Sequence, residues 1–170
     1  MGKPVFLIGY MGSGKSTTGK KLSKLMGYLF IDLDEEIEKM TGKEIQRIFA
    51  EDGEDAFRLL EHSILVSLTS RKNIVISTGG GTPCYYDNMA LMNRSGVTVY
   101  LKMQPESLAK RLMNAKKQRP LIQGKPEHEL PGFIKNHLEK REPFYSSSHL
   151  TQKGESLDIN DLLKQVREHL

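Results

Sequence analysis

The segment VFLIGYMGSGKS, residues 5–16, joins an apolar run to a glycine-rich loop that ends in Lys15 and Ser16. Residues 9–16 fit the pattern G-x-x-x-x-G-K-[S/T], in which a strand precedes the loop and a helix follows it. Glycines let successive backbone N–H groups turn inward as an anion site, to which the helix N-terminus adds its positive end. The segment therefore predicts a strand, a phosphate-binding loop and a helix. The alternative is an ordinary glycine-rich turn.

The loop also carries the side chains that a nucleoside triphosphate requires. Lys15 is placed to reach the terminal phosphates, and the Ser16 hydroxyl is a ligand type that Mg²⁺ takes beside them. The predicted nucleotide contacts of the loop are Gly12, Ser13, Gly14, Lys15, Ser16 and Thr17.

Composition limits the class of protein. A chain of 170 residues, 38% hydrophobic and 27% charged, suits one domain with a sizeable core. It has no apolar run of membrane-spanning length, no signal-peptide pattern and a single cysteine, Cys84, so we expect a cytoplasmic protein without a membrane partner. The net charge of +4 suits an anionic ligand, but the basic residues form no run of five, which argues against nucleic acid.

Strands and helices are predicted to alternate along the chain. Short apolar stretches typical of buried parallel strands occur at residues 5–8, 74–76 and 97–101. Residues 29–31 are expected to form a short second strand, and residues 149–151 are a weak candidate for a fifth. Helical spacing of apolar residues occurs at residues 15–26, 55–70 and 159–166. The pattern predicts a three-layer α/β fold, a parallel sheet with helices on both faces.

Two carboxylates are candidates for metal and proton chemistry. The stretch at residues 74–78 ends without the aspartate that many phosphate-loop proteins place there, so Asp32 and Asp34, which close the second predicted strand, are expected to serve instead. In an extended chain both side chains would share a face. One carboxylate would act on Mg²⁺ and the other would take the proton of an attacking hydroxyl. The alternative is that Asp34 only caps a helix beginning at Glu35.

The glycine triplet Gly79, Gly80 and Gly81 follows the third predicted strand. Such a run favours no regular structure and is expected where backbone approaches another group closely. We predict contact with the phosphoryl acceptor; the alternative is a tight turn without a ligand.

Two arginines stand out among the basic residues. Arg58 lies near the start of the predicted helix at residues 55–70, with Glu61 three residues on. Arg141 precedes Pro143, which is expected to end its helix and turn the side chains toward the cleft. Two guanidinium groups in one cleft would suit an acidic substrate. The alternative is that each forms a surface ion pair.

Residues 114–126 contain prolines, glycine and basic residues, Arg119 among them, with little apolar content. We interpret this segment as a mobile lid that closes over the phosphates and excludes water. A solvated connector is the alternative.

As a set, these motifs resemble the shikimate kinase family, P-loop enzymes that phosphorylate the 3-hydroxyl of shikimate with ATP in aromatic amino-acid biosynthesis. The resemblance covers nearly the whole chain, from Val5 to Tyr145. Its motifs are the loop at residues 9–16, DxD at 32–34, GExxFR at 53–58 with Glu61 after it, the glycine triplet, RPL at 119–121 and RxPxY at 141–145.

The resemblance implies a single P-loop kinase domain over residues 1–170, with a five-stranded parallel sheet in the order 2-3-1-4-5. It implies a shikimate-binding region at about residues 33–61 and a lid at about 114–126. Asp34 would hold the reacting hydroxyl, and Lys15 and Arg119 would stabilise the transferring phosphoryl group. The remaining implied roles are the shikimate carboxylate for Arg58 and Arg141, a ring hydroxyl for the triplet and Gly80 above all, Mg²⁺ through water for Asp32, and direct Mg²⁺ ligation for Ser16.

The adenine side is less well defined. Arg111 is the candidate for stacking on the base, and Gln152 and Lys153 are expected to form the loop on its other side. Ser147 and His149 stand where the family usually carries an acidic residue and an alanine. ATP is favoured by analogy and by the lack of the NKxD signature of GTPases.

Two other functions stay open at this point. A related small-molecule kinase, such as one for gluconate, would also take a sugar-like acid. A nucleotide-binding module that has lost catalysis would need only the phosphate-binding loop. We expect a monomer with shikimate and ATP as ligands.

Overall fold

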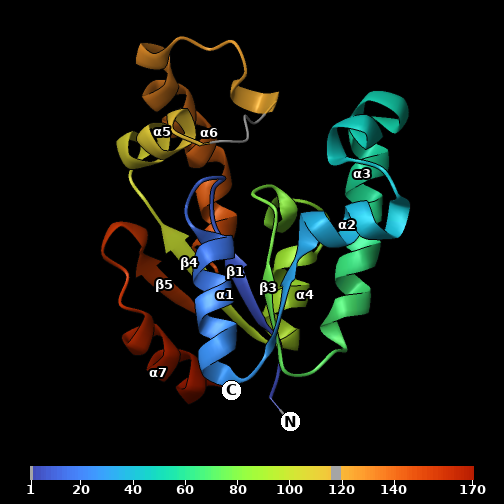
Figure 1. Ribbon diagram of the computed structural model, residues 1–170, viewed down its shortest axis with the longest axis vertical. Coiled ribbons are helices and arrows are strands. Elements are labelled where there is room, and N and C mark those ends of the chain that lie inside the picture. The colour runs from blue at the N-terminus through green and yellow to red at the C-terminus, as the bar shows by residue number, and fades with distance from the viewer. Residues whose placement is uncertain (1, 116–119) are drawn as a thin grey trace.

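A computed structural model describes residues 2–115 and 120–170 of the chain (Figure 1). Its strands are β1 (Val5–Ile8), β2 (Leu29–Asp32), β3 (Ile74–Ser77), β4 (Val97–Lys102) and β5 (Leu150–Lys153). They form one parallel sheet in the order β2-β3-β1-β4-β5. The predicted strand order is confirmed, and β1 has the predicted bounds. Arg119, the predicted lid arginine, lies outside the described residues.

Helices connect the strands. They are α1 (Lys15–Met26), α2 (Leu33–Thr41), α3 (Ile45–Thr69), α4 (Asn88–Ser95), α5 (Pro105–Met113), α6 (Leu130–Tyr145) and α7 (Ile159–His169). Short 3₁₀ turns lie at η1 (Thr82–Cys84), η2 (Pro120–Ile122), η3 (Glu127–Glu129) and η4 (Gly154–Ser156). The predicted bounds of α1 are confirmed, because Gly14 and Gly27 flank it in left-handed conformations that end the helical pattern.

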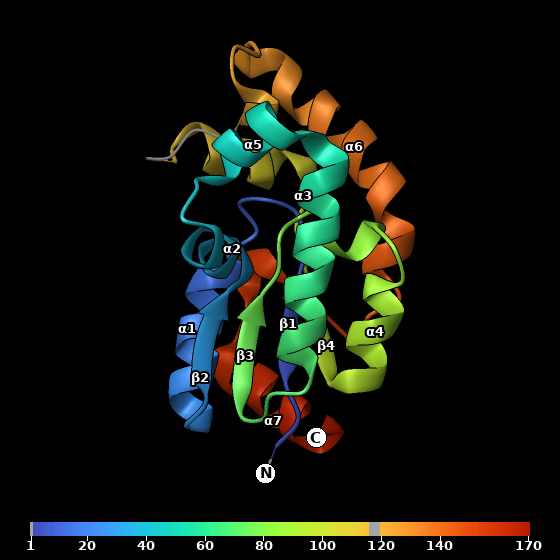
Figure 2. The same ribbon diagram turned by 90° about the vertical axis from the view of Figure 1, so that its right-hand side faces the viewer.

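The interior strands β1, β3 and β4 are buried on both faces, which explains why they are mainly apolar. Val5 and Leu7 of β1 pack with residues of α1 and α7, such as Leu22 and Leu162. Phe6 and Ile8, on the opposite face, pack in the larger cluster formed with α2 to α6. Figure 2 shows the resulting three layers, with α1 and α7 on one side of the sheet and α3 and α4 on the other.

The long helix α3 differs from the prediction of a helix at residues 55–70. It begins at Ile45 and continues through Gly53, whose φ of 84° and ψ of 171° kink it. Only glycine adopts this conformation readily, so the kink depends on Gly53. The part of α3 that precedes Gly53 was not predicted. The kink turns the first part of α3 sideways, so that it lies beyond the carboxyl ends of β2 and β3 and past α2 (Figure 2).

The prediction that Pro143 ends its helix is wrong. Pro143 lies inside α6, which continues to Tyr145. Proline removes one backbone donor, but so near the helix end little structure depends on it, and Ser146 N–H still bonds to the Glu142 carbonyl at 2.8 Å. Arg141 therefore projects from a regular helix.

All strands point their carboxyl ends to one edge of the sheet, where parallel α/β proteins bind ligands. The nucleotide loop follows β1 there, α2 follows β2, and the glycine triplet follows β3. Within residues 2–115 and 120–170, no helix combines the length and apolar character that a bilayer span needs.

Candidate functional site

The loop between β1 and α1 has the geometry of an anion cradle. Gly12 and Gly14 adopt φ values of 81° and 91°, which turn the backbone N–H groups inward at the start of α1. The Lys15 ammonium group donates hydrogen bonds to the carbonyl oxygens of Gly9, at 2.8 Å, and Tyr10, at 2.9 Å. These bonds hold the lysine across the loop, beside the position that phosphates would take.

Ser16 and Asp32 meet at the edge of this cradle. Ser16 Oγ donates to Asp32 Oδ2 at 2.8 Å and lies 3.4 Å from Ser77 Oγ. The other oxygen of Asp32 accepts the backbone N–H groups of Asp34 and Glu35, so Asp32 caps α2. A hydroxyl and a carboxylate in contact form the kind of oxygen site that a hard cation such as Mg²⁺ prefers.

The predicted geometry of the two aspartates needs two corrections. The helix begins at Leu33, so residues 32–34 are not extended and the shared strand face does not exist. The capping residue is Asp32, not Asp34. Both carboxylates still line one cavity, because the strand ends and the first turn of α2 opens at the same edge of the sheet.

A cavity of about 320 Å³ lies over the loop. Its walls include most of the predicted nucleotide and metal residues, namely Gly12, Gly14, Lys15, Ser16, Thr17, Asp32 and Arg111, together with the predicted catalytic residue Asp34. Ser13 does not line it, and its buried hydroxyl has no hydrogen-bond partner among the described residues. We call this the phosphate cavity.

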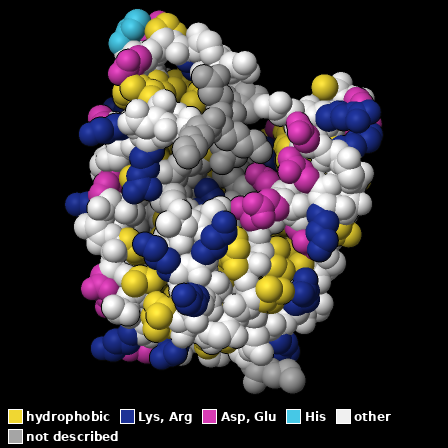
Figure 3. Space-filling view, viewed as in Figure 1, with side chains coloured by type: hydrophobic (Ala, Val, Ile, Leu, Met, Phe, Trp, Pro, Cys, Tyr) yellow, Lys and Arg dark blue, Asp and Glu magenta, His cyan; other side chains and the backbone are white. Residues whose placement is uncertain are grey.

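A second cavity of about 690 Å³ opens next to the first. It is lined by the predicted acceptor residues Asp34, Arg58, Gly79, Gly80, Gly81 and Arg141. The two cavities share Met11, Asp34, Gly79 and Gly80. Figure 3 shows this face hollowed between the α5–α6 side and the α2–α3 side, with acidic side chains gathered at the α2 edge. We call the second cavity the acceptor cavity.

The glycine triplet lets the charged groups approach the backbone closely. A Cβ on Gly81 would lie 2.5 Å from Arg58 Nη2, and one on Gly80 would lie 2.9 Å from Arg141 Nη1. A Cβ on Gly79 would lie 3.2 Å from Glu61 Oε2. Any side chain here would therefore displace one of these groups, which is a physical reason for three successive glycines.

Arg58 is held by a buried carboxylate. Its Nη1 donates to Glu61 Oε1 at 3.0 Å, and Glu61, only 1% exposed, also accepts a hydrogen bond from Thr82 Oγ1 at 2.8 Å. Burial raises the pKa of Glu61 although Arg58 opposes this, and the Glu61 carboxylate keeps the pKa of Arg58 raised against burial. The pair thus fixes a guanidinium group at the wall of the acceptor cavity.

Arg141 lies across the cavity on α6. Its guanidinium carbon is 5.6 Å from the centre of the Tyr10 ring, and the Tyr10 hydroxyl lies 3.0 Å from His137 Nδ1. Burial and the charges of Arg141 and Lys140 lower the pKa of His137 to about 4, so the imidazole is neutral at pH 7. The Tyr145 hydroxyl of the same helix donates to the Gly80 carbonyl and joins α6 to the triplet.

The adenine side differs in part from the prediction. Arg111 lines the phosphate cavity, and its Nη1 lies 3.5 Å from the Gly12 carbonyl. Gln152 and Lys153 form no loop, because they are the last residues of β5, paired with β4, and Lys153 is exposed. His149 has a structural use, since its backbone N–H donates to Thr98 Oγ1 at 2.9 Å and its ring accepts the Thr98 N–H.

Several residues of the acceptor cavity were not singled out from the sequence. Ile45, Gln46, Phe49, Glu54 and Phe57 lie within the predicted binding region at about residues 33–61, whereas Met11, Tyr85 and His137 lie outside every predicted region. Helical spacing could have pointed to His137, which is four residues before Arg141 and so on the same helix face. Leu121 and Gln123 belong to the predicted lid. No comparable pattern points to Tyr85, which reaches the cavity from the segment after η1.

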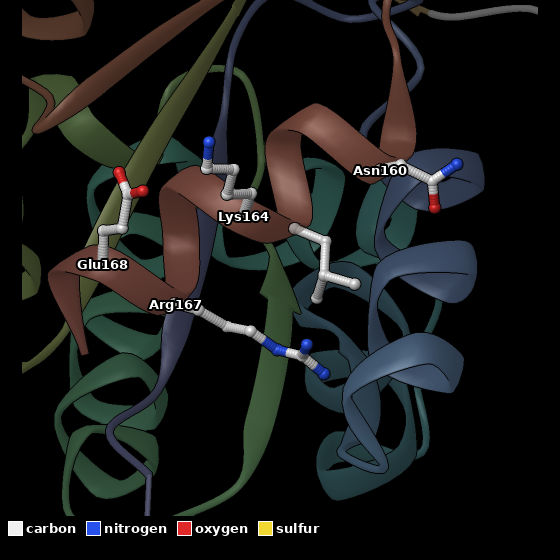
Figure 4. A pocket seen from close by; sticks show the side chains of 5 residues that line it. Asn160, Lys164, Arg167 and Glu168 are labelled. Atoms are coloured by element: carbon white, nitrogen blue, oxygen red, sulfur yellow. The ribbon is translucent and has the colours of Figure 1, made fainter.

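A third hollow, of about 370 Å³, lies on the outer surface of α7 (Figure 4). Its lining side chains, Asn160, Leu163, Lys164, Arg167 and Glu168, come from that single helix. It includes no residue from the carboxyl edge of the sheet and adds nothing to the site.

A phosphate loop on a 2-3-1-4-5 parallel sheet, with an acceptor cavity opening beside it, places the chain in the class of P-loop kinases. The model of the shikimate kinase family matches residues 11–170. A shikimate kinase of Parabacteroides distasonis is 49% identical over 164 residues, which cover 94% of this chain and 95% of that protein. The chain therefore belongs to the shikimate kinase family, as its motifs predict, and is an enzyme.

Comparison with solved structures supports the same family. The chain matches the crystal structure of shikimate kinase from Bacteroides thetaiotaomicron with a TM-score of 0.90 and 44% identity, over 98% of this chain and 97% of that one. It matches shikimate kinase from Acinetobacter baumannii, in complex with shikimate, with a TM-score of 0.86 and 34% identity, over 99% and 92% of the two chains. A gluconokinase from Sinorhizobium meliloti, over 96% and 89%, has a TM-score of 0.58 at 19% identity and shares the fold alone. The family match thus favours shikimate kinase over the gluconate alternative.

Proposed function

We propose that this family member transfers the γ-phosphoryl group of ATP to the 3-hydroxyl of shikimate across the junction of the two cavities. The observation that carries the proposal is that Asp34 lines both the phosphate cavity and the acceptor cavity. A hydroxyl bound beside Asp34 would face the end of a triphosphate in the loop. Alignment of this kind supplies most of the catalysis in phosphoryl transfer.

Asp34 would orient the attacking hydroxyl and accept its proton. Lys15 would exchange its bonds to the Gly9 and Tyr10 carbonyls for phosphate oxygens and so stabilise the transferring group. We assign Arg119 the same stabilising role, as part of the lid expected at about residues 114–126. Lid closure would exclude water, since a kinase that admits water hydrolyses its ATP.

The residues around Ser16 fit a magnesium ion. Ser16 Oγ would be the direct ligand, and Asp32 Oδ2, 2.8 Å away, would act on the ion through its bound water. When bound, Mg²⁺ supplies positive charge that neutralises the phosphate oxygens. Phosphate oxygens and water would complete its coordination, which agrees with Mg²⁺ keeping several waters in kinase sites.

Arg58 and Arg141 would bind the carboxylate of the acid, and the Gly79–Gly81 backbone would approach its ring, with Gly80 nearest a ring hydroxyl. Support comes from their common position in the acceptor cavity and from the space that the missing side chains leave. On the nucleotide side we assign Gly12, Ser13, Gly14 and Thr17 to the phosphates and Arg111 to the base. Lys153 is a weaker assignment because of its place on β5.

We further propose that residues 1–170 act as one domain, in a monomeric cytoplasmic enzyme that binds neither nucleic acid nor membrane. Light scattering of the purified chain tests the monomer, and cell fractionation tests the compartment.

The proposed reaction is tested by ADP release in a coupled assay, with shikimate, with gluconate and with neither acid. Release that requires shikimate supports the proposal, and release that requires gluconate rejects it. Asp34→Asn should remove most turnover while ATP still binds, because the triphosphate contacts lie in the loop. The matched control is Asp55→Asn, at an exposed aspartate on α3 outside both cavities. Near-normal turnover of the Asp34 variant would reject its role.

The role of Arg141 is tested separately with Arg141→Ala. Loss of a desolvated charge pair weakens binding by about 2–5 kcal/mol, so the KM for shikimate should rise while ATP binding is kept. An unchanged KM for the acid would show that Arg141 does not contact it.

A further inference from the structure

Arg58 has a second support besides Glu61. Its guanidinium carbon lies 4.1 Å from the centre of the Tyr85 ring, well within the range of a cation–π contact. It also lies 5.2 Å from the centre of the Phe57 ring. The side chain of Arg58 is only 11% exposed, so this contact is shielded from water, which strengthens it.

The Tyr85 hydroxyl closes a network around the same guanidinium. It donates to Glu54 Oε1 at 2.9 Å, and that oxygen lies 3.7 Å from Arg58 Nε. Burial and the Glu54 carboxylate raise the pKa of the Tyr85 hydroxyl, which therefore remains a donor at neutral pH. Arg58 Nε itself is buried and has no hydrogen-bond partner among the described residues. Tyr85 and Glu54 thus fix the plane of the guanidinium, while Glu61 fixes one end of it.

The orientation of that plane decides whether Arg58 can bind a carboxylate through two parallel N–H groups. An arginine side chain has several rotatable bonds, and ordering it on ligand binding opposes affinity. A guanidinium already held between an aromatic face and a carboxylate loses less freedom when the ligand arrives. The hydrogen bond from Arg58 Nη1 to Glu61 would not by itself fix the plane of the guanidinium, because the group could still rotate about that bond.

We propose that Tyr85 is a positioning residue that holds the Arg58 guanidinium in the plane required to bind the carboxylate of the acid substrate. This inference rests on the proposed function, because it deepens the assignment of Arg58 in the acceptor cavity. Tyr85 acts through its ring, which carries the guanidinium, and through its hydroxyl, which tethers Glu54. It is not required to touch the reacting atoms.

The test compares Tyr85→Leu, which removes ring and hydroxyl, with Tyr85→Phe, which keeps the ring. We expect the KM for shikimate to rise about tenfold in the leucine variant and about threefold in the phenylalanine variant. The KM for ATP and kcat should stay within about twofold, because the phosphate cavity contains no atom of Tyr85. The matched control is Tyr86→Leu, at the neighbouring tyrosine, which is 57% exposed and outside the cavity.

A double-mutant cycle separates positioning from a general loss of structure. In an Arg58→Ala background, Tyr85→Leu should raise the KM for shikimate no further, since no guanidinium remains to be positioned. The thermal midpoint and the KM for ATP of each variant show that it folds. An unchanged KM for shikimate in Tyr85→Leu overturns the inference, as does an equal loss with and without Arg58. Wild-type enzyme without shikimate-dependent ADP release would instead reject the proposed function.

Discussion

Substitution of Gly81 by alanine tests how closely the triplet and Arg58 fit together. Gly81 has φ −91° and ψ −13°, a conformation that alanine adopts without strain, so the backbone gives no reason for glycine. The added Cβ would lie 2.5 Å from Nη2, 2.8 Å from Nη1 and 2.9 Å from Cζ of Arg58. Non-bonded atoms prefer about 3.5–4 Å, so the guanidinium must move by about 1 Å.

That displacement should act on substrate binding. Glu61 and Tyr85 hold the guanidinium on its other sides, so it must leave its place rather than adjust within it. A hydrogen bond to a charged group contributes about 1.5–3 kcal/mol, and loss of about 2–3 kcal/mol raises a dissociation constant about 30- to 150-fold. We therefore expect a KM for shikimate that is higher by this factor, with a nearly unchanged KM for ATP.

The assay is steady-state ADP release at saturating ATP over a range of shikimate concentrations. The matched control is Gly132→Ala on α6, where an added Cβ would meet nothing within 4 Å and alanine should stabilise the helix by about 0.5–1 kcal/mol. A Gly81→Ala enzyme with the wild-type KM for shikimate would refute the reasoning, because the guanidinium would then have no fixed place beside the triplet.

Three further predictions concern the metal site, the buried carboxylate and the imidazole. Asp32→Asn should keep the cap of α2 and the thermal midpoint, since asparagine caps as well as aspartate, but should raise the Mg²⁺ concentration for half-maximal activity about tenfold; an unchanged Mg²⁺ titration would exclude Asp32 from the metal site. Thr82→Val should destabilise the fold by about 1–3 kcal/mol in urea unfolding, because it leaves buried Glu61 without its hydroxyl donor, and Thr82→Ser should restore most of this. The reasoning fails if serine and valine behave alike. His137 has a pKa of about 4 in the folded protein, below its ordinary 6.5, so the folded state binds fewer protons. Its contribution to stability is complete above pH 6.5 and is lost as the pH falls toward 4, and His137→Gln should flatten that part of the urea midpoint curve; a curve of unaltered slope would contradict the shift.

The interior strands could be predicted because a strand that is buried on both faces consists mainly of apolar residues. Residues 5–8 are all apolar and residues 97–101 are apolar except for Thr98, and each segment belongs to an interior strand of the sheet. The phosphate loop could also be predicted, because its glycines, lysine and serine are required by the local backbone geometry of a few successive residues. Local chemistry of this kind does not depend on the rest of the chain.

Helix boundaries depend on more than local pattern. The predicted helix at residues 55–70 began only after Gly53, and Pro143 was predicted to end its helix, yet α3 passes through Gly53 with a kink and α6 passes through Pro143 without ending. In each case tertiary packing on both sides holds the helix, with Ile48 and Phe57 buried around the first and Leu138 and Tyr145 around the second. The penalty of one poor helix residue is smaller than the burial that continuing the helix secures.

In the site, many of the residues could be predicted from the sequence, but their contacts could not. Asp32 and Asp34 were brought together by an argument from an extended strand that the structure contradicts, yet they do meet, because topology sends every strand end to one edge. The topology of the sheet brings residues into the same region, but it does not determine which side chains contact one another there. The stacking of Arg58 on Tyr85 joins residues that no sequence period or motif connects, so it could not be predicted from the sequence. Such contacts set the orientation of the groups that topology gathers, so substitutions there should change affinity for the acid while the fold and the nucleotide loop stay as they are.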